Sequence, residues 1–404
     1  MKIIKSKIVK FVRQVVKYIN FKIIVPVAYK FYCLSPKDEK LVLFADLRDR
    51  STPDNFLGLI KMCEENGYKC EVLSGRPYSK RFPRRVQKRE KIKFQFRFLK
   101  LYAKCHRLFL VEYFPLADAV KPRPGTKIIQ LWHGCGAMKT MGYAGTGKGW
   151  GASAWQKKTY PMHEHYSLVP ISSGNLVPFY EEAFQVKPGI VKGMGMPRTD
   201  IYFDKEYIAN ARKNLLEHFP EIGERKVILF APTFRGKSIA RSFYYMNIDF
   251  RKYKKLLGDK YVFITKFHPM MAHGGLTDSM KIMGEGFVYD ATYVLTPEEA
   301  LCAADVLVGD YSSIVFEYLL LERPIVSYIY DLDDYVSDRG LFCPYEETMP
   351  GPYAFDEDEL LQHLLTVDEW FDVEKTRRYR EKFMADCDGH STERIFNTVF
   401  GKTE

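Results

Sequence analysis

The chain has 404 residues, of which 46% are apolar and 27% are charged. These shares are close to those of globular proteins, and they exclude a disordered chain, a collagen and a coiled coil. At roughly 150 residues per domain, the length predicts two domains, each able to bury its own core. The eight cysteines form no C-x-x-C pair and no metal-ligand spacing. We therefore expect reduced thiols, with neither a disulfide framework nor a structural zinc.

The net charge of +11 is concentrated in two segments. Residues 1–30 contain eight Lys or Arg side chains and no acid, and residues 76–107 contain thirteen against Glu90 alone. The second segment either extends a membrane-facing surface or forms a solvated helical face. No nucleic-acid-binding module accompanies either segment, so we expect no nucleic-acid partner.

The first basic segment also carries an apolar stripe at helical spacing, with most of its cations off that stripe. This pattern is typical of a helix in a membrane interface, where each basic residue near an anionic leaflet contributes roughly 1 kcal/mol. We expect an amphipathic basic helix within residues 1–35, on an anionic membrane surface and ended by Pro26. The alternative is an amphipathic helix docked on the protein's own core. The stripe consists of Ile4, Ile8, Phe11, Val12, Val15 and Ile19.

Neither a transmembrane segment nor a secretory signal is expected near the N-terminus. The longest uncharged run there, from Ile23 to Tyr29, is far shorter than the roughly 20 apolar residues of a spanning helix. Lysines recur where a signal sequence needs an uninterrupted apolar core. We therefore expect the protein to stay in the cytosol.

Further along the chain, short apolar runs alternate with helical patterns. Helices are expected at about 55–65 and 207–219. This alternation predicts an α/β fold with mostly parallel sheets and helices on both faces. The expected strands are at 40–45, 70–73, 107–111, 127–132, 167–171, 226–230, 261–266, 306–309 and 324–328.

These strands group into two doubly wound, Rossmann-like domains, expected at residues 36–195 and 196–385. Such domains bind ligands at the carboxyl ends of their strands, so an interdomain cleft is the expected site. Residues 386–404 are expected to form a C-terminal helix that crosses back over the junction.

The first motif that carries chemistry is Q-L-W-H-G-C-G-A-M-K-T-M-G-Y, at residues 130–143. It places His133 at the carboxyl edge of a sheet, where an imidazole can take a proton from a hydroxyl near neutral pH. Gly134 and Gly136 allow backbone amides to approach a ligand closely. A structural histidine after a strand is the alternative.

Three further segments bring cations to the same cleft. Arg198 lies in G-M-P-R-T-D, Arg235 ends L-F-A-P-T-F-R together with Thr233, and T-K-F-H-P supplies Lys266 and His268. Guanidinium and ammonium groups that converge on one place offset the charge of several phosphate oxygens. Each segment alone could be an ordinary turn or surface loop, but their shared position at strand ends favours a phosphate site.

The segment V-G-D-Y-S-S-I-V-F-E-Y, at residues 308–318, carries the strongest pattern. A buried strand ends at Asp310, and Ser312 and Ser313 precede an apolar helix expected at 314–321. Free backbone N–H groups, two hydroxyls and the positive end of the helix dipole are typical of a phosphate site. Glu317 lies one helical turn along, where its carboxylate can accept hydrogen bonds from ribose hydroxyls. Serines that only cap the helix are the alternative.

Over roughly residues 105–390 the sequence resembles the CDP-glycerol glycerophosphotransferase family, which includes teichoic-acid primases and polymerases. The resemblance implies the two-domain GT-B architecture, with CDP-alcohol bound by the C-terminal domain and membrane and acceptor bound by the N-terminal domain. It rests on W-H-G (132–134), G-x-P-R-T-D (195–200), A-P-T-x-R (231–235), H-P (268–269), D-Y-S-S-x-x-x-E (310–317), R-P-I (323–325) and Y-D-L-x-x-Y…R-G (330–340).

The resemblance further implies a polyol-phosphate transferase at the cytoplasmic face of the membrane, held there peripherally. It would move glycerol phosphate from CDP-glycerol to a hydroxyl of an undecaprenyl-linked acceptor and release CMP. Neither a metal nor a cofactor is expected. The expected catalytic residues are His133, as general base, and His268, which with Arg235 and Lys266 stabilises the pyrophosphate. The expected substrate-binding residues are Trp132, Gly134, Arg198, Pro232, Thr233, Arg235, Lys266, Asp310, Ser312, Ser313 and Glu317.

The sequence is consistent with several alternative donors and functions. Residues 135–139 read C-G-A-M-K, where glycerol-transferring relatives often have T-P-x-K, and this variant also resembles CDP-ribitol-using relatives. The same fold would suit a GT-B glycosyltransferase that uses a nucleotide sugar, and a non-catalytic membrane-associated scaffold is a third alternative. A homo-oligomer is left open, and the short N-terminal region favours a priming or few-unit transferase over a long-chain polymerase.

Overall fold

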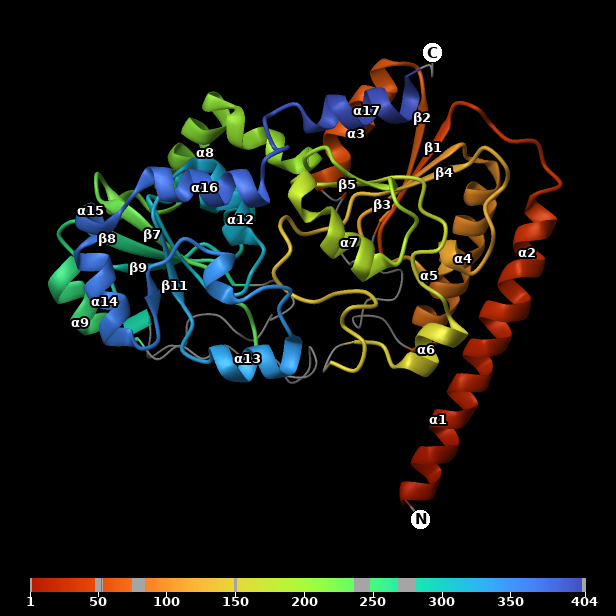
Figure 1. Cartoon of the computed structure of the whole chain (residues 1–404), viewed down its shortest axis with the longest axis horizontal. Coiled ribbons are helices and arrows are strands. Elements are labelled where there is room, and N and C mark those ends of the chain that lie inside the picture. Colours follow the sequence, from red (N-terminus) through yellow and green to blue (C-terminus); the bar gives the residue numbers. More distant parts are fainter. Residues whose placement is uncertain are drawn as a thin grey trace.

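The computed structural model describes residues 2–47, 52, 54–74, 84–148, 151–235, 248–267, 281–282 and 284–401. The strands of these residues build two main parallel sheets that lie side by side, each with helices packed on it (Figure 1). The predicted α/β fold with parallel sheets is therefore confirmed.

The first sheet has the strand order β2-β1-β3-β4, with every pair parallel. The parallel pair β5-β6 continues it, because a bridge between Ile129 and Leu168 joins the pair to β4. Apolar runs that are buried almost throughout explain why β1, β3, β4 and β5 form strands between helices, whereas β2 and β6 are partly exposed. The strands are β1 (Leu41–Ala45), β2 (Lys69–Leu73), β3 (Arg107–Leu110), β4 (Lys127–Gln130), β5 (Val169–Ile171) and β6 (Val191–Gly193).

The second sheet has the parallel order β9-β8-β7-β10-β11-β12. This is the 3-2-1-4-5-6 order of doubly wound folds, and it reverses between β7 and β10. Ligands of such sheets bind in the crevice at the carboxyl ends of the two strands that flank the reversal. The strands are β7 (Lys226–Phe230), β8 (Tyr261–Thr265), β9 (Val288–Asp290), β10 (Val306–Gly309), β11 (Ile325–Tyr328) and β12 (Tyr353–Ala354).

Helices cover both sheets, and the C-terminal helix α17 lies beside α3 on the first sheet (Figure 1). Its apolar residues share a buried cluster with β1 and β3. The helices of the first half are α1 (Lys2–Ile19), α2 (Val25–Tyr32), α3 (Asp54–Glu65), α4 (Arg84–Lys104), α5 (Pro115–Asp118), α6 (Ala154–Thr159), α7 (Val177–Phe184) and the 3₁₀ segment η3 (Pro197–Phe203). Those of the second half are α8 (Lys205–His218), α9 (Phe250–Leu257), α11 (Pro297–Ala303), α12 (Ile314–Tyr318), η7 (Leu319–Leu321), α13 (Leu332–Arg339), α14 (Glu357–Leu365), α15 (Val367–Trp370), α16 (Val373–Phe383) and α17 (Ser391–Phe400).

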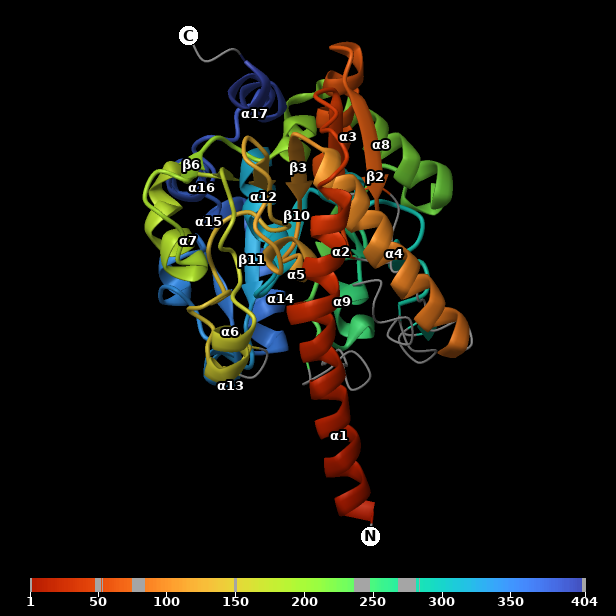
Figure 2. The same ribbon diagram turned by 90° about the vertical axis from the view of Figure 1, so that its right-hand side faces the viewer.

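The N-terminal helix does not end at Pro26, so that prediction is wrong. A π-helical segment, Asn20–Ile24, connects α1 to α2, and the helical path continues to Tyr32. Pro26 falls in the first turn of α2, where a missing N–H is tolerated. Figure 2 shows α1 extending away from the sheets, whereas α2 lies along α4. Among the described residues, no helix combines the length and apolar character needed to cross a bilayer.

Differences from the predicted strands are small and local. Strand β4 ends at Gln130 instead of Trp132, because the side chain of Gln130 accepts the backbone N–H of Trp132 and turns the chain. Strands β6, β9 and β12 were not predicted, since they have only two or three residues and lack a recognisable apolar run.

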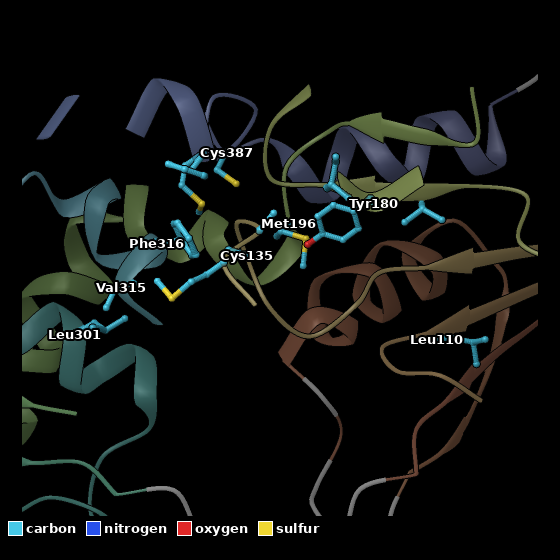
Figure 3. Close-up of a cluster of buried hydrophobic side chains, with 14 of the residues drawn as sticks. Leu110, Cys135, Tyr180, Met196, Leu301, Val315, Phe316 and Cys387 are labelled. Atoms are coloured by element: carbon cyan, nitrogen blue, oxygen red, sulfur yellow. The ribbon is translucent and has the colours of Figure 1, made fainter. Parts of the chain in front are cut away.

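One buried apolar cluster extends through both halves of the molecule. It joins residues of β3 and α7 from the first half to residues of α11 and α12 from the second. Figure 3 shows part of it, with Met196 and Cys135 between the two sheets. The two halves are therefore joined by a packed apolar core, which holds the strand ends of both sheets in one arrangement.

Candidate active site

The turn after β4 has an unusual backbone at Trp132, whose φ is +58°. A bulky residue in this left-handed region costs roughly 1–3 kcal/mol, so surrounding contacts must hold it. Its N–H donates to Oε1 of Gln130 at 3.0 Å, and its C=O accepts from Nδ2 of Asn55 at 3.1 Å. The centroid of the indole ring lies 4.6 Å from the ring centroid of His133 and 5.1 Å from that of Phe184. The turn therefore fixes His133 at the carboxyl edge of the first sheet.

This turn lies directly on the start of α12. A Cβ added to Gly134 would lie 3.2 Å from Oγ of Ser313, which is closer than an ordinary van der Waals contact. A Cβ added to Gly136 would overlap the ring of Phe316, and Gly136 has a φ of +68°. Glycine is therefore required at 136 for both space and backbone conformation. The W-H-G and D-Y-S-S motifs, far apart in sequence, are in contact.

A buried ion pair ties the two halves together beside this contact. Arg198, in η3, donates to the C=O of His133 at 2.9 Å and pairs with the carboxylate of Glu317 on α12. Burial acts to lower the pKa of Arg198, but the Glu317 carboxylate outweighs it and the pKa is raised. The hydroxyl of Tyr202 donates to the other oxygen of Glu317 at 2.9 Å. Both oxygens of Glu317 thus accept from this chain, and its predicted contact with ribose stays a prediction.

Asp310 organises the crevice at the strand reversal. Its carboxylate accepts from the hydroxyl of Thr233 at 2.7 Å and from the N–H of Tyr311 at 2.6 Å. Arg235 donates to it at 3.0 Å and binds Asp331 through two nitrogens, at 2.6 and 2.9 Å. The loops after β7 and β10 are therefore locked to each other. Arg235 is buried between two carboxylates, so its predicted role toward pyrophosphate also stays a prediction.

The other predicted site residues lie around this crevice. Lys266, after β8, donates to the carbonyl of Thr292 at 2.7 Å and to that of Leu295, and burial lowers its pKa. Ser312 accepts the N–H of Ile314 at 3.4 Å. Pro232 is half-buried in the loop after β7. His268 and Pro269 lie outside the described residues.

Sequence reasoning missed several polar residues of this region. Asn55, at the start of α3, receives the N–H of Arg198 at 3.1 Å while it donates to Trp132. Tyr202 and Asp331 hold Glu317 and Arg235. In the sequence, Asn55 and Asp331 are recognisable only as polar residues at helix starts, and such residues are usually solvated. Within the ranges that the structure describes, no group of three His, Cys, Asp or Glu side chains is placed to hold a metal.

Comparison with known proteins places this chain in a family. The family model described as CDP-Glycerol:Poly(glycerophosphate) glycerophosphotransferase matches residues 27–401. The teichoic acid ribitol-phosphate primase of Bacillus spizizenii is 31% identical over 376 residues, which are 92% of this chain and 94% of that protein. The poly(ribitol-phosphate) polymerase of the same organism is 33% identical over 74% of this chain, and the chain spans only 47% of that longer relative.

A solved structure of the wall teichoic acid polymerase TagF matches the fold. Its TM-score is 0.73 at 19% sequence identity, and the match covers 97% of each chain. The two chains therefore share a fold. From the extent of the family match, the chain belongs to the CDP-glycerol:poly(glycerophosphate) glycerophosphotransferase family.

Proposed function

We propose that this protein transfers a polyol phosphate from a CDP-linked donor to a hydroxyl of a lipid-linked acceptor and releases CMP. Family membership and the teichoic acid primases among the relatives support this reaction. The observation that carries the proposal is the contact between the W-H-G turn and the start of α12, at Gly134 and Ser313. It brings a histidine from one sheet to the phosphate-type helix start of the other.

In the proposed reaction, the acceptor oxygen attacks the phosphorus that bears the polyol. A new bond forms between them, and the bond from that phosphorus to the bridging oxygen breaks. The bridging oxygen leaves with CMP, and the imidazole of His133 takes the proton of the acceptor hydroxyl. Such a transfer needs little covalent help, so positioning and charge stabilisation supply most of the rate.

The donor lies, in this proposal, over the strand ends of the second sheet. Ser312 and Ser313 bind phosphate, Trp132 and Gly134 close the site from the first sheet, and His268 stabilises the departing phosphate. The remaining proposed substrate contacts are Arg198, Pro232, Thr233, Arg235, Lys266, Asp310 and Glu317. Asp310, Arg235 and Glu317 also bind neighbouring side chains, and these contacts hold the loops of the proposed site in place.

The donor polyol is glycerol or ribitol, and the relatives favour ribitol. Ribitol-phosphate enzymes are 31–33% identical to this chain, and the glycerol-phosphate primase of Bacillus subtilis is 27% identical. The test incubates the protein with CDP-glycerol, CDP-ribitol or a UDP-sugar, each with a lipid-linked acceptor. CMP release from one CDP-polyol supports the proposal, and turnover of only the UDP-sugar supports a glycosyltransferase instead.

We also propose a peripheral position at the cytoplasmic face of the membrane. Helix α1 projects from the body, and Phe11 and Val16 on it are 65% and 60% exposed. Apolar side chains on a basic helix suit an anionic lipid surface. In this layout residues 1–35 bind the membrane, residues 36–195 the acceptor and residues 196–385 the CDP-polyol in a GT-B arrangement, with 386–404 crossing back.

A further inference from the structure

A buried side chain behind the W-H-G turn has no part in the reaction as described so far. Gln130 is the last residue of β4 and is fully buried. Its Oε1 accepts the N–H of Trp132 at 3.0 Å, which is the contact that closes the left-handed turn. Its Nε2 donates to the C=O of Glu112 at 2.9 Å and to the hydroxyl of Tyr166 at 2.8 Å.

The orientation of this amide is determined by its partners. A backbone C=O only accepts and a backbone N–H only donates, so Nε2 must face Glu112 and Oε1 must face Trp132. The amide therefore has its oxygen and both hydrogens in use. Only a side chain that carries both a donor and an acceptor at its tip can make the same contacts.

The hydrogen-bonded chain continues from Gln130 to His163. The hydroxyl of Tyr166, which accepts from Gln130, also shares a hydrogen bond with Nδ1 of His163, 2.9 Å away. Burial lowers the pKa of His163 to about 3, so this ring is neutral near pH 7. Phe184 then packs 4.3 Å from the ring of His163 and 5.1 Å from that of Trp132. Polar and aromatic contacts thus converge on the Trp132 turn.

We propose that Gln130 is a positioning residue for His133, acting through the Trp132 turn and held in its own orientation by Tyr166 and His163. The role assigned to His133 rests on the proposed function, whereas the effect of Gln130 on the turn does not. If the turn relaxes, the indole of Trp132 moves away from the imidazole, and His133 shifts relative to Ser313. A displacement of about 1 Å at a catalytic group can reduce a rate by about 100-fold.

The test uses Gln130→Met, which keeps the length of the side chain and removes both hydrogen-bonding ends. We expect Trp132 to leave the left-handed region in the crystal structure of this variant. We expect kcat for CMP release to fall about 10- to 100-fold, with the donor KM changed less than about threefold. A turn that keeps its φ near +58°, or a kcat within twofold of the parent, overturns the proposal.

Tyr166→Phe carries the test if Gln130→Met does not fold. It removes one of the two acceptors of Nε2 and leaves the Trp132 contact, so we expect a smaller kcat loss of about 2- to 10-fold. The matched control is Tyr253→Phe, a buried hydroxyl on α9 that donates to the C=O of Glu357, and its kcat should equal the parent's. Equal kcat values for the two variants overturn the proposal. A parent protein without CMP release refutes the proposed function instead and leaves the crystallographic test of the turn intact.

Discussion

Replacing Glu317 with glutamine keeps the shape of the side chain and removes its charge. The side chains of Arg198 and Glu317 are 14% and 5% exposed, so the guanidinium would stay buried beside a neutral amide. Removing one partner of a buried ion pair typically costs about 3–5 kcal/mol, because the remaining charge is desolvated without compensation. We expect the free energy of unfolding of Glu317→Gln to fall by about that amount.

A matched control exists at the surface of the same protein. Glu322 binds two arginines, Arg377 and Arg380, whose side chains are 47% and 30% exposed, and its own side chain is 22% exposed. Because water screens these partly solvated pairs, Glu322→Gln should lose much less stability than Glu317→Gln. Urea and thermal denaturation of both variants measure the difference. Equal stability of the two variants would refute the reasoning that the Arg198–Glu317 pair ties the two sheets together.

The double variant Arg198→Met/Glu317→Leu completes this comparison. Apolar replacement of a whole buried pair is often neutral or stabilising, so the double variant should be more stable than Glu317→Gln alone. Its CMP release should nevertheless stay low, because Arg198 also holds the carbonyl of His133.

Three other predictions concern the turn, a buried carboxyl and the N-terminal helix. Gly136→Ala should lose more stability than Gly189→Ala in denaturation experiments, because both have a positive φ but only the first would meet a side chain, that of Phe316. Equal losses would contradict the packing of the turn on α12. Burial raises the pKa of Asp118 to about 7 from 3.8, so the folded state binds more protons than the unfolded state between these values. Stability should therefore fall as pH rises from about 4 to 7, and this fall should be smaller in Asp118→Asn; identical pH profiles would contradict it. Sedimentation with anionic vesicles should require residues 1–30 and weaken at high salt, whereas binding that is insensitive to both would contradict a membrane role of this helix.

Local pattern was sufficient for most of the fold. Strands β7 and β10 have the predicted bounds because each is an apolar run followed at once by polar or small residues. The parallel arrangement followed from the alternation of such runs with helices. The bounds of β4 could not be predicted, because they depend on a hydrogen bond from the backbone of Trp132 to the side chain of Gln130.

The candidate site could be predicted only in part, for a physical reason. A sequence shows which cations follow strands, but it does not show which of them are already paired. Arg235 binds Asp331, 96 residues later, and Lys266 donates to backbone carbonyls of the loop before α11. Asn55 meets Arg198 only because α3 and η3 pack together. These partners come from distant segments and therefore have no local signal.

The measurement that most directly tests whether both sheets contribute to one site is a comparison of His133→Ala with Ser313→Ala, with donor binding and CMP release followed separately. We expect His133→Ala to bind the CDP-polyol with nearly the parent's affinity and to lose CMP release by at least about 100-fold, as for removal of a general base. Ser313→Ala should weaken donor binding. CMP release by His133→Ala at the parent's rate would contradict a shared site.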